Sequence, residues 1–310
     1  MKKKLVSILL AAALAMSMLA GCGGSDNADT GADANASAEN EDVSASNFDV
    51  SELISVYSRE DGSGTRGAFV ELFGIEQKNE AGEKVDYTTV EAIITNSTDV
   101  MMTSVAGDTY AIGYISLGSL NDTVKAIKIN GVEATVYNIK AGTYTVARPF
   151  NIATAGEVSE VTQDFINYIM SAEGQAVVEE KGYIPVAGTE SFVSNGATGK
   201  IVVGGSSSVS PVMEKLIEAY LAINTGAEIE LQTSDSSTGM SQAEEGIVDI
   251  GMASRVIKDS EIEAGLTGTT IAMDGIAVIV NHENPVDNLS SEAVKTIFMG
   301  DVYEWSEVAE

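Results

Sequence analysis

The sequence predicts an α/β protein whose lobes contain largely parallel sheets. Short runs of β-branched and aromatic residues alternate with segments in which apolar residues recur at helical spacing. Polar, hydroxyl-rich loops follow four of the strand-like runs. Because ligands bind beyond the carboxyl ends of strands in such sheets, the four loops are expected to form one shared site. For each loop taken alone, an ordinary capped turn is the alternative.

The start of the chain is expected to be an export and anchoring segment. Three lysines precede an apolar run over residues 5–20, which is too short for a convincing membrane span and is typical of a secretory signal over residues 1–21. The run ends in LAGC, which resembles the bacterial lipobox, so Cys22 is expected to carry lipid. Residues 22–47 are small and polar and predict a flexible tether. The chain is therefore expected to be extracytoplasmic and lipid-anchored to the cell membrane.

The charge balance excludes some partners. The formal net charge is −29, and removal of residues 1–21 takes away three lysines and no acidic residue. Nucleic acid and anionic membrane surfaces are poor partners for so acidic a protein. An anion site in this chain must depend on a few close donors, because long-range attraction is absent.

The first polar loop, residues 59–66, has the features of an anion site. The preceding residues 53–58 have strand character, and the apolar residues that follow have helical spacing up to Gly74, a typical helix end. A strand-to-helix turn directs the N–H groups of Ser63, Gly64 and Thr65 toward a ligand. Arg59 adds a permanent charge with a planar fork, and two of the four arginines flank this loop.

The rest of the first half also contains strand and helix patterns. Residues 111–116 predict a buried strand, and residues 126–129 with 132–137 predict a hairpin that turns at Asn130-Gly131. Pro149 favours an extended segment over residues 143–150. The apolar spacing of residues 158–178 predicts one amphipathic helix.

The second half repeats the alternation. Strands are predicted over residues 201–205, 229–232 and 248–253, and the last of them delivers Ser254 and Arg255. Helices are expected from Pro211 with Ser210 as N-cap, from the loop at 234–239 to Gly246, and from Ser290 through Phe298. Residues 270–281 are long and apolar, which indicates a strand that crosses between two lobes.

The residues for enzyme chemistry are largely missing. His282 is the sole histidine and follows an apolar run, where a surface role is the more ordinary reading. Zinc-ligand spacing and acidic calcium loops are absent from the sequence. We therefore expect a binding protein without catalytic residues, metal or cofactor, and a secreted hydrolase is the weaker alternative.

The polar loops together resemble the phosphate-binding proteins of bacterial ABC-type phosphate importers. The matching stretches are residues 59–66, 111–114, 205–211, 249–255, 271–281 and 297–305. In that family the part like 201–305 comes first and the part like 56–188 follows, so this chain resembles a circular permutant, or a fragment of two tandem copies. The resemblance implies a two-lobed periplasmic-binding-protein-like fold of type II. One lobe would comprise residues 48–147 plus 275–310, and the other residues 148–274.

The resemblance also implies a set of phosphate contacts. In this sequence they fall on Arg59, Ser63, Gly64, Thr65, Ser208, Val209 and Ser236. Asp61 is expected to pair with Arg59 and orient it. Ser254 stands where some members place an acceptor carboxylate, so either Asp61 takes that role or sulfate is rejected less strongly.

The implied function is extracytoplasmic binding of inorganic phosphate in a cleft between the lobes and its delivery to a membrane permease. A phosphate or oxyanion sensor, or a degenerate binding protein that no longer serves transport, is the alternative.

Overall fold

The computed structural model describes residues 48–186 and 190–308, which belong to one unit that spans Ser46–Glu310. The predicted signal peptide, the predicted tether at 22–47 and Cys22 lie outside the described residues.

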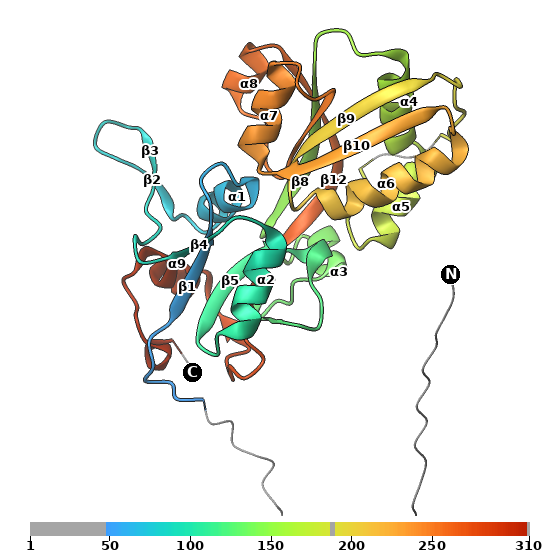
Figure 1. Cartoon of the computed structure of the whole chain (residues 1–310). Coiled ribbons are helices and arrows are strands. Elements are labelled where there is room, and N and C mark those ends of the chain that lie inside the picture. The colour runs from blue at the N-terminus through green and yellow to red at the C-terminus, as the bar shows by residue number, and fades with distance from the viewer. Residues whose placement is uncertain (1–47, 187–189, 309–310) are drawn as a thin grey trace, which may run out of the picture. The chain divides into compact units, whose positions relative to one another are not determined.

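A path of hydrogen-bonded strands runs through the unit in the order β10-β9-β11-β8-β12-β5-β1-β4, and β6 pairs with β12 beside this path (Figure 1). The bounds of these strands are β1 Ser55–Arg59, β4 Ile93–Thr95, β5 Ala111–Ser116, β6 Lys125–Ala126, β8 Ala147–Ala155, β9 Gly199–Ser206, β10 Ala227–Ser234, β11 Ile250–Ala253 and β12 Leu266–Val280. Two short pairs complete the strands, β2 Glu76–Lys78 with β3 Lys84–Asp86, and β7 Lys128–Ile129 with β13 Asn288–Leu289.

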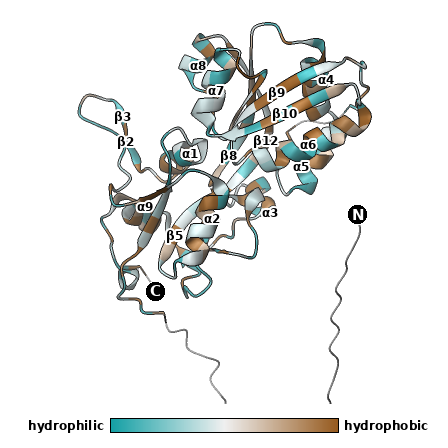
Figure 2. Ribbon diagram, viewed as in Figure 1, coloured by the Kyte–Doolittle hydropathy of each residue, from teal (hydrophilic) through white to brown (hydrophobic). Residues whose placement is uncertain are grey.

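Helices connect the strands and pack beside them. Their bounds are α1 Gly64–Leu72, α2 Thr98–Gly107, α3 Val136–Lys140, α4 Glu160–Ile169, α5 Ala172–Glu180, α6 Ser210–Ile223, α7 Ser236–Glu244, α8 Asp259–Glu263 and α9 Ser291–Met299, with 3-10 turns at η1 Leu117–Ser119 and η2 Trp305–Glu307. Helices α4, α5 and α6 lie beside β9 and β10 (Figure 1). Helix α6 alternates hydrophobic and hydrophilic residues along its turns, as a helix with one buried side should (Figure 2).

Strand β12 is the predicted long apolar strand, and it takes part in two sheets. Its residues from Leu266 to Gly275 pair with β8, and those from Ile276 to Val280 pair with β5. The partner changes at one point, between Gly275 and Ile276.

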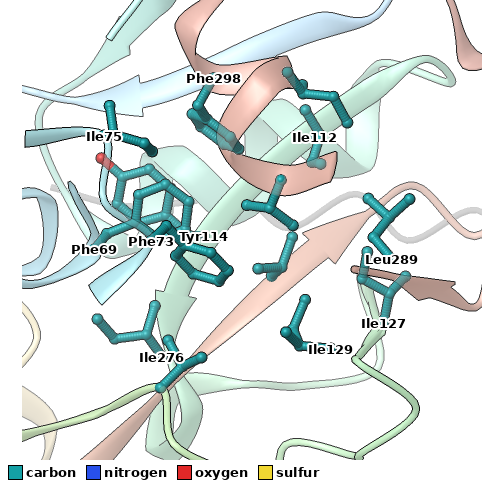
Figure 3. Close-up of a cluster of buried hydrophobic side chains, with 14 of the residues drawn as sticks. Phe69, Phe73, Ile75, Ile112, Tyr114, Ile127, Ile129, Ile276, Leu289 and Phe298 are labelled. Carbon is teal, nitrogen blue, oxygen red and sulfur yellow. The ribbon is translucent and has the colours of Figure 1, made fainter. Parts of the chain in front are cut away.

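Two large hydrophobic clusters lie on the two parts of this strand path. The first contains Phe69, Tyr114 and Phe298 (Figure 3). The rings of Phe69 and Tyr114 stack with their centroids 3.9 Å apart, and Phe298 meets Phe69 edge-on at 4.7 Å. The second cluster is built around β9, α4 and α6, with Phe165 and Tyr220 in contact at 5.0 Å. Each cluster gathers residues from distant parts of the sequence, so β1 and β9 are each held firmly where they end.

Several local predictions are wrong. Two helices replace the single helix at 158–178, because Ser171 caps α5: its hydroxyl accepts from the N–H of Gly174 at 3.2 Å. Asn130 and Gly131 do form a turn with φ of 52° and 79°, but only one bridge, from Ile129 to Val132, follows it, and helix α3 takes the place of the second strand.

The predicted N-cap and sheet type also need correction. Val209 holds the N-cap position of α6, and Ser210 lies inside the helix, where its hydroxyl contacts Ser206 O at 3.3 Å and Thr233 Oγ1 at 2.8 Å. The sheets are mixed: β10-β9-β11 and β5-β1-β4 are parallel, whereas β8 and β12 run antiparallel to their neighbours.

Candidate functional site

The amino ends of α1, α2 and α6 meet at the hydroxyl of Ser208, and the amino end of α7 lies against Gly64 of α1. Helices α1, α2, α6 and α7 each follow a strand, β1, β4, β9 and β10 respectively. Ser208 Oγ lies 2.8 Å from Thr65 Oγ1 and 3.2 Å from Thr98 Oγ1, and all three side chains are buried. Helix amino ends carry partial positive charge and unpaired N–H groups, so this convergence favours an anion.

Arg59 brings a full positive charge to the same place. It ends β1, and only 2% of the residue is exposed. Its Nε and Nη2 each donate to the carboxylate of Glu60 at 2.8 Å, and Nη2 also donates to Ser207 Oγ at 3.1 Å. The backbone N–H of Arg59 donates to the hydroxyl of Tyr114 at 3.1 Å. The guanidinium is thus fixed between the 59–66 loop and the loop that opens α6.

The predicted pairing of Asp61 with Arg59 is wrong. The Asp61 side chain is 98% exposed and accepts a hydrogen bond from Arg66 Nη1 at 3.0 Å. Asp61 stands at the tip of a turn that continues through Gly62 at φ +89°, so its carboxylate is carried toward solvent. Glu60, the residue next to Arg59, makes the bidentate pair instead.

The first turn of α1 contributes backbone donors. Ser63 is the N-cap, its hydroxyl accepts from the N–H of Arg66 at 3.3 Å, and its own N–H is already bonded to Glu60 O at 3.2 Å. Among the described residues, the N–H groups of Gly64 and Thr65 have no acceptor. Two of the three N–H groups expected to face a ligand are therefore unpaired.

Gly64 allows the closest approach in the site. A Cβ at this position would lie 2.3 Å from Ser236 Oγ and 2.8 Å from Ser254 Oγ, which is closer than such atoms can pack. The absence of a side chain lets α1 touch the loops that follow β10 and β11. Nearby, the N–H of Ser237 donates to Gly62 O at 3.1 Å.

Opposite the first turn of α1, serine side chains at the ends of β9, β10 and β11 form a connected hydrogen-bonded group. Ser206 Oγ donates to Ser254 Oγ at 2.9 Å, and the N–H of Ser254 donates to Ser236 Oγ at 3.1 Å. The N–H of Val209, an expected phosphate donor, is bonded to Ser206 O at 3.0 Å. The sequence therefore located Arg59, Gly64, Thr65, Ser208, Ser236 and Ser254, which the structure brings together.

Four residues of the site were not predicted. They are Glu60, Thr98, Ser206 and Ser207. A signal for Thr98 was present: Ser97 follows two isoleucines and precedes Thr98-Asp99, which is a typical strand end and helix N-cap. Glu60 lies beside Arg59 in sequence, and Asp61 was preferred to it only through the family resemblance.

Arg66 and Asp86 hold the 59–66 loop in place. Arg66 donates to Asp86 Oδ2 at 2.8 Å and to Arg59 O at 2.9 Å, which connects the loop to β3. Burial by itself would raise the pKa of Asp86, but hydrogen bonds from Thr88 and Arg66 outweigh it and lower the pKa below its ordinary value of 3.8. His282 contacts Asp122 O at 2.9 Å and none of the hydroxyls of the site.

Asp86→Asn is expected to reduce stability at neutral pH and to have little effect in acid. A carboxylate whose folded-state pKa is depressed stabilises the protein above its unfolded pKa, and this contribution is lost as pH falls through the folded pKa. The pair is partly exposed, so the difference should be about 1 kcal/mol or less. Urea unfolding of both proteins at pH 7 and near pH 3 checks this. A difference that stays constant between the two pH values would contradict it.

Comparison with known proteins shows to which family the chain belongs. Residues 41–173 and 192–310 match the model of the PBP superfamily domain. The phosphate-binding protein PstS 2 of Streptococcus agalactiae serotype V is 54% identical over 257 residues, which cover 83% of this chain and 88% of the relative. The chain belongs to the PstS family. The predicted family and two-lobed fold type are thereby confirmed.

Other PstS relatives differ in how much of the chain they match. A solved phosphate-binding protein of a phosphate ABC transporter from Streptococcus pneumoniae TIGR4 is 43% identical, covers 83% of this chain and 99% of its own length, and has a TM-score of 0.65. The phosphate-binding protein PstS of Bacillus subtilis is 33% identical over only 114 residues, 36% of this chain and 38% of the relative.

The described residues offer neither a membrane-spanning helix nor a cluster of metal ligands. Within residues 48–186 and 190–308, no helix has the length and apolar character to span a membrane. No cluster of three or more His, Cys, Asp or Glu side chains in the same ranges could hold a metal ion.

Proposed function

We propose that this chain binds inorganic phosphate among the hydroxyls around Ser208 and delivers it to the permease of an ABC-type phosphate importer. The observation that supports this most is the convergence of the amino ends of α1, α2 and α6 on Ser208, next to Ser207, which Arg59 Nη2 reaches at 3.1 Å. Such a site offers N–H and O–H donors and one guanidinium to a small tetrahedral anion. The relatives carry the name phosphate-binding protein.

The mechanism we propose is closure of two lobes on the anion. One lobe comprises residues 48–147 plus 275–310, and the other residues 148–274. Contacts between them include Thr65 with Ser208 and Arg59 with Ser207. A phosphate that bonds to both sides stabilises this closed arrangement over an open one, and the closed form is what the permease recognises. The protein acts by binding, without catalysis.

We propose that discrimination against sulfate is weak. Hydrogen phosphate can donate a proton to an acceptor, whereas sulfate cannot, so a free carboxylate in the site would favour phosphate. Here Ser254 occupies the position of that carboxylate, Asp61 faces solvent, and Glu60 is engaged with Arg59. Serine hydroxyls can accept the proton, but they can also rotate and donate to sulfate.

Two further proposals concern membrane anchoring and the order of the two halves of the chain. Lipid at Cys22 would hold the protein outside the membrane, as expected for PstS-like proteins, which are extracytoplasmic. The order of the halves would be a circular permutation relative to family members such as the Bacillus subtilis protein. Its match to about one third of this chain is what a swapped order would produce.

Titration calorimetry with inorganic phosphate, sulfate and arsenate tests the proposed function. We expect phosphate to bind with micromolar or tighter affinity, about 8 kcal/mol of binding free energy, and sulfate to bind measurably but more weakly. Absence of phosphate binding in the millimolar range would overturn the proposal. Sulfate binding too weak to detect would overturn only the proposed weak discrimination.

A further inference from the structure

Arg148 is a buried arginine whose hydrogen-bonding capacity is largely unused. Only 2% of the residue is exposed, and its one hydrogen bond runs from Nη2 to Asp274 Oδ2 at 3.2 Å. Its Nε and Nη1 have no hydrogen-bond partner among the described residues. Burying charged donors without a partner is costly, so an occupant of this space is expected.

The other buried arginines do not share this feature. Arg59 places Nε and Nη2 on the carboxylate of Glu60. Arg255 places Nη1 and Nη2 on the carboxylate of Glu261 at 2.9 and 2.6 Å, and Nη1 also donates to Val256 O. The unused donors of Arg148 are therefore specific to its position.

That position lies on a strand next to the one that leads into the proposed phosphate site. Arg148 lies on β8 opposite Asp274 of β12, and the adjacent register pair joins Ala147 to Gly275. On its other side, β8 pairs with β11. The end of β11 leads directly to Ser254, whose hydroxyl accepts a hydrogen bond from Ser206 Oγ. Burial lowers the pKa of Arg148, and the positive charge of Arg59 lowers it further.

The surroundings of Arg148 contain more unused polar groups. Asp274 Oδ1 accepts from the N–H of Gly118 at 3.3 Å, so the pair is tied to the segment after β5. The hydroxyls of Ser116, Ser119 and Tyr183 are buried and lack a hydrogen bond of good geometry. Burial raises the pKa of Tyr183, and the negative charge of Asp274 raises it further. Polar atoms in such number are suited to ordered water or to the oxygens of an anion.

We propose that Arg148 is a second guanidinium for the bound anion, whose unpaired Nε–H and Nη1–H groups donate to its oxygens directly or through one ordered water. This inference rests on the proposed phosphate function. Asp274 holds the guanidinium in place through Nη2 and leaves the other edge of the fork free for the ligand. Arg148 therefore complements Arg59, whose charge is shared with Glu60.

The first experiment measures phosphate affinity by titration calorimetry. Arg148→Gln would leave Asp274 buried and unpaired, so the variant used is the double substitution Arg148→Gln with Asp274→Asn. We expect it to bind phosphate at least about tenfold more weakly than the unaltered protein. The matched control is Arg255→Gln with Glu261→Gln, which removes a buried pair whose donors are already satisfied and should change affinity less than about twofold.

The second experiment follows the unaltered protein and uses a variant for signal assignment alone. The chain has four arginines, so a nitrogen-15 spectrum of the Nε–H groups contains four signals, and Arg148→Lys identifies the one from residue 148. Addition of inorganic phosphate should shift this signal and slow its exchange with water, because a new acceptor forms. The signal of Arg255 should move little.

The outcomes separate the two proposals. If the unaltered protein does not bind phosphate, the proposed function fails. If it binds phosphate while the Arg148 signal does not respond, or the double variant folds and binds as tightly as the unaltered protein, only the role of Arg148 is overturned. A responding signal together with weakened binding supports it.

Discussion

Arg59→Ala is expected to weaken phosphate binding at least about a hundredfold, because hydrogen bonds from a charged group contribute about 1.5–3 kcal/mol each. The substitution removes the guanidinium that lies between Glu60 and Ser207. It also leaves the Glu60 carboxylate without its partner close to the anion, and the two negative charges would repel each other. Titration calorimetry of the purified variant measures the effect.

The controls for this prediction come from the same residue and the same loop. Arg59→Lys keeps the charge but loses the planar fork, and we expect an intermediate affinity. Asp61→Asn should leave affinity within about threefold of the unaltered protein, because the Asp61 carboxylate faces solvent and contacts Arg66 at a distance from the hydroxyls. Unchanged phosphate affinity in a folded Arg59→Ala protein would refute the placement of the site.

Gly64→Ala is expected to cost at least about a hundredfold in phosphate affinity, through loss of two or more close donors. The added methyl group would lie 2.3 Å from Ser236 Oγ and 2.8 Å from Ser254 Oγ. Rotation of the Ser236 hydroxyl would relieve the closest contact, but the methyl group would still press against Ser236 Cβ at 3.1 Å, so Ser236 must also shift. The two sides must then move apart, and the anion loses its contacts with one of them.

Gly67→Ala provides the matched control, since it lies in the same helix. A methyl group there meets only Arg255 Cδ, at an ordinary distance of 3.9 Å. We expect Gly67→Ala to bind phosphate as the unaltered protein does and to gain slightly in stability, because alanine favours helix over glycine. Equal affinities of the two variants would show that the close contact at Gly64 does not matter for binding. Small-angle scattering with phosphate should show Gly64→Ala more open than Gly67→Ala.

The sequence identified residues that the structure brings together where a local pattern and its chemistry coincide. Arg59, Gly64 and Thr65 follow from one strand-to-helix turn, and Ser208 and Ser236 from two loops of the same kind. The predicted long strand at 270–281 is present as the end of β12, because a run of apolar residues can be buried on both faces. These features depend on neighbours in sequence.

The failures concern choices that tertiary contacts decide. Glu60 and Asp61 are adjacent acids, and only the direction of the turn at Gly62 determines that Glu60 meets Arg59. The break at Ser171 interrupts an apolar pattern that continues in sequence across two helices. The unpaired Nε and Nη1 of Arg148 could not be predicted from sequence, because they depend on how the folded chain places potential hydrogen-bond acceptors around the guanidinium.

The cluster around Phe69, Tyr114 and Phe298 also has a consequence for synthesis. A ribosome releases the amino-terminal part first, but this core lacks α9 and the closing part of β12 until almost the whole chain has emerged. Pairings between such distant segments form slowly. The packing of this cluster therefore cannot be completed until late in translation.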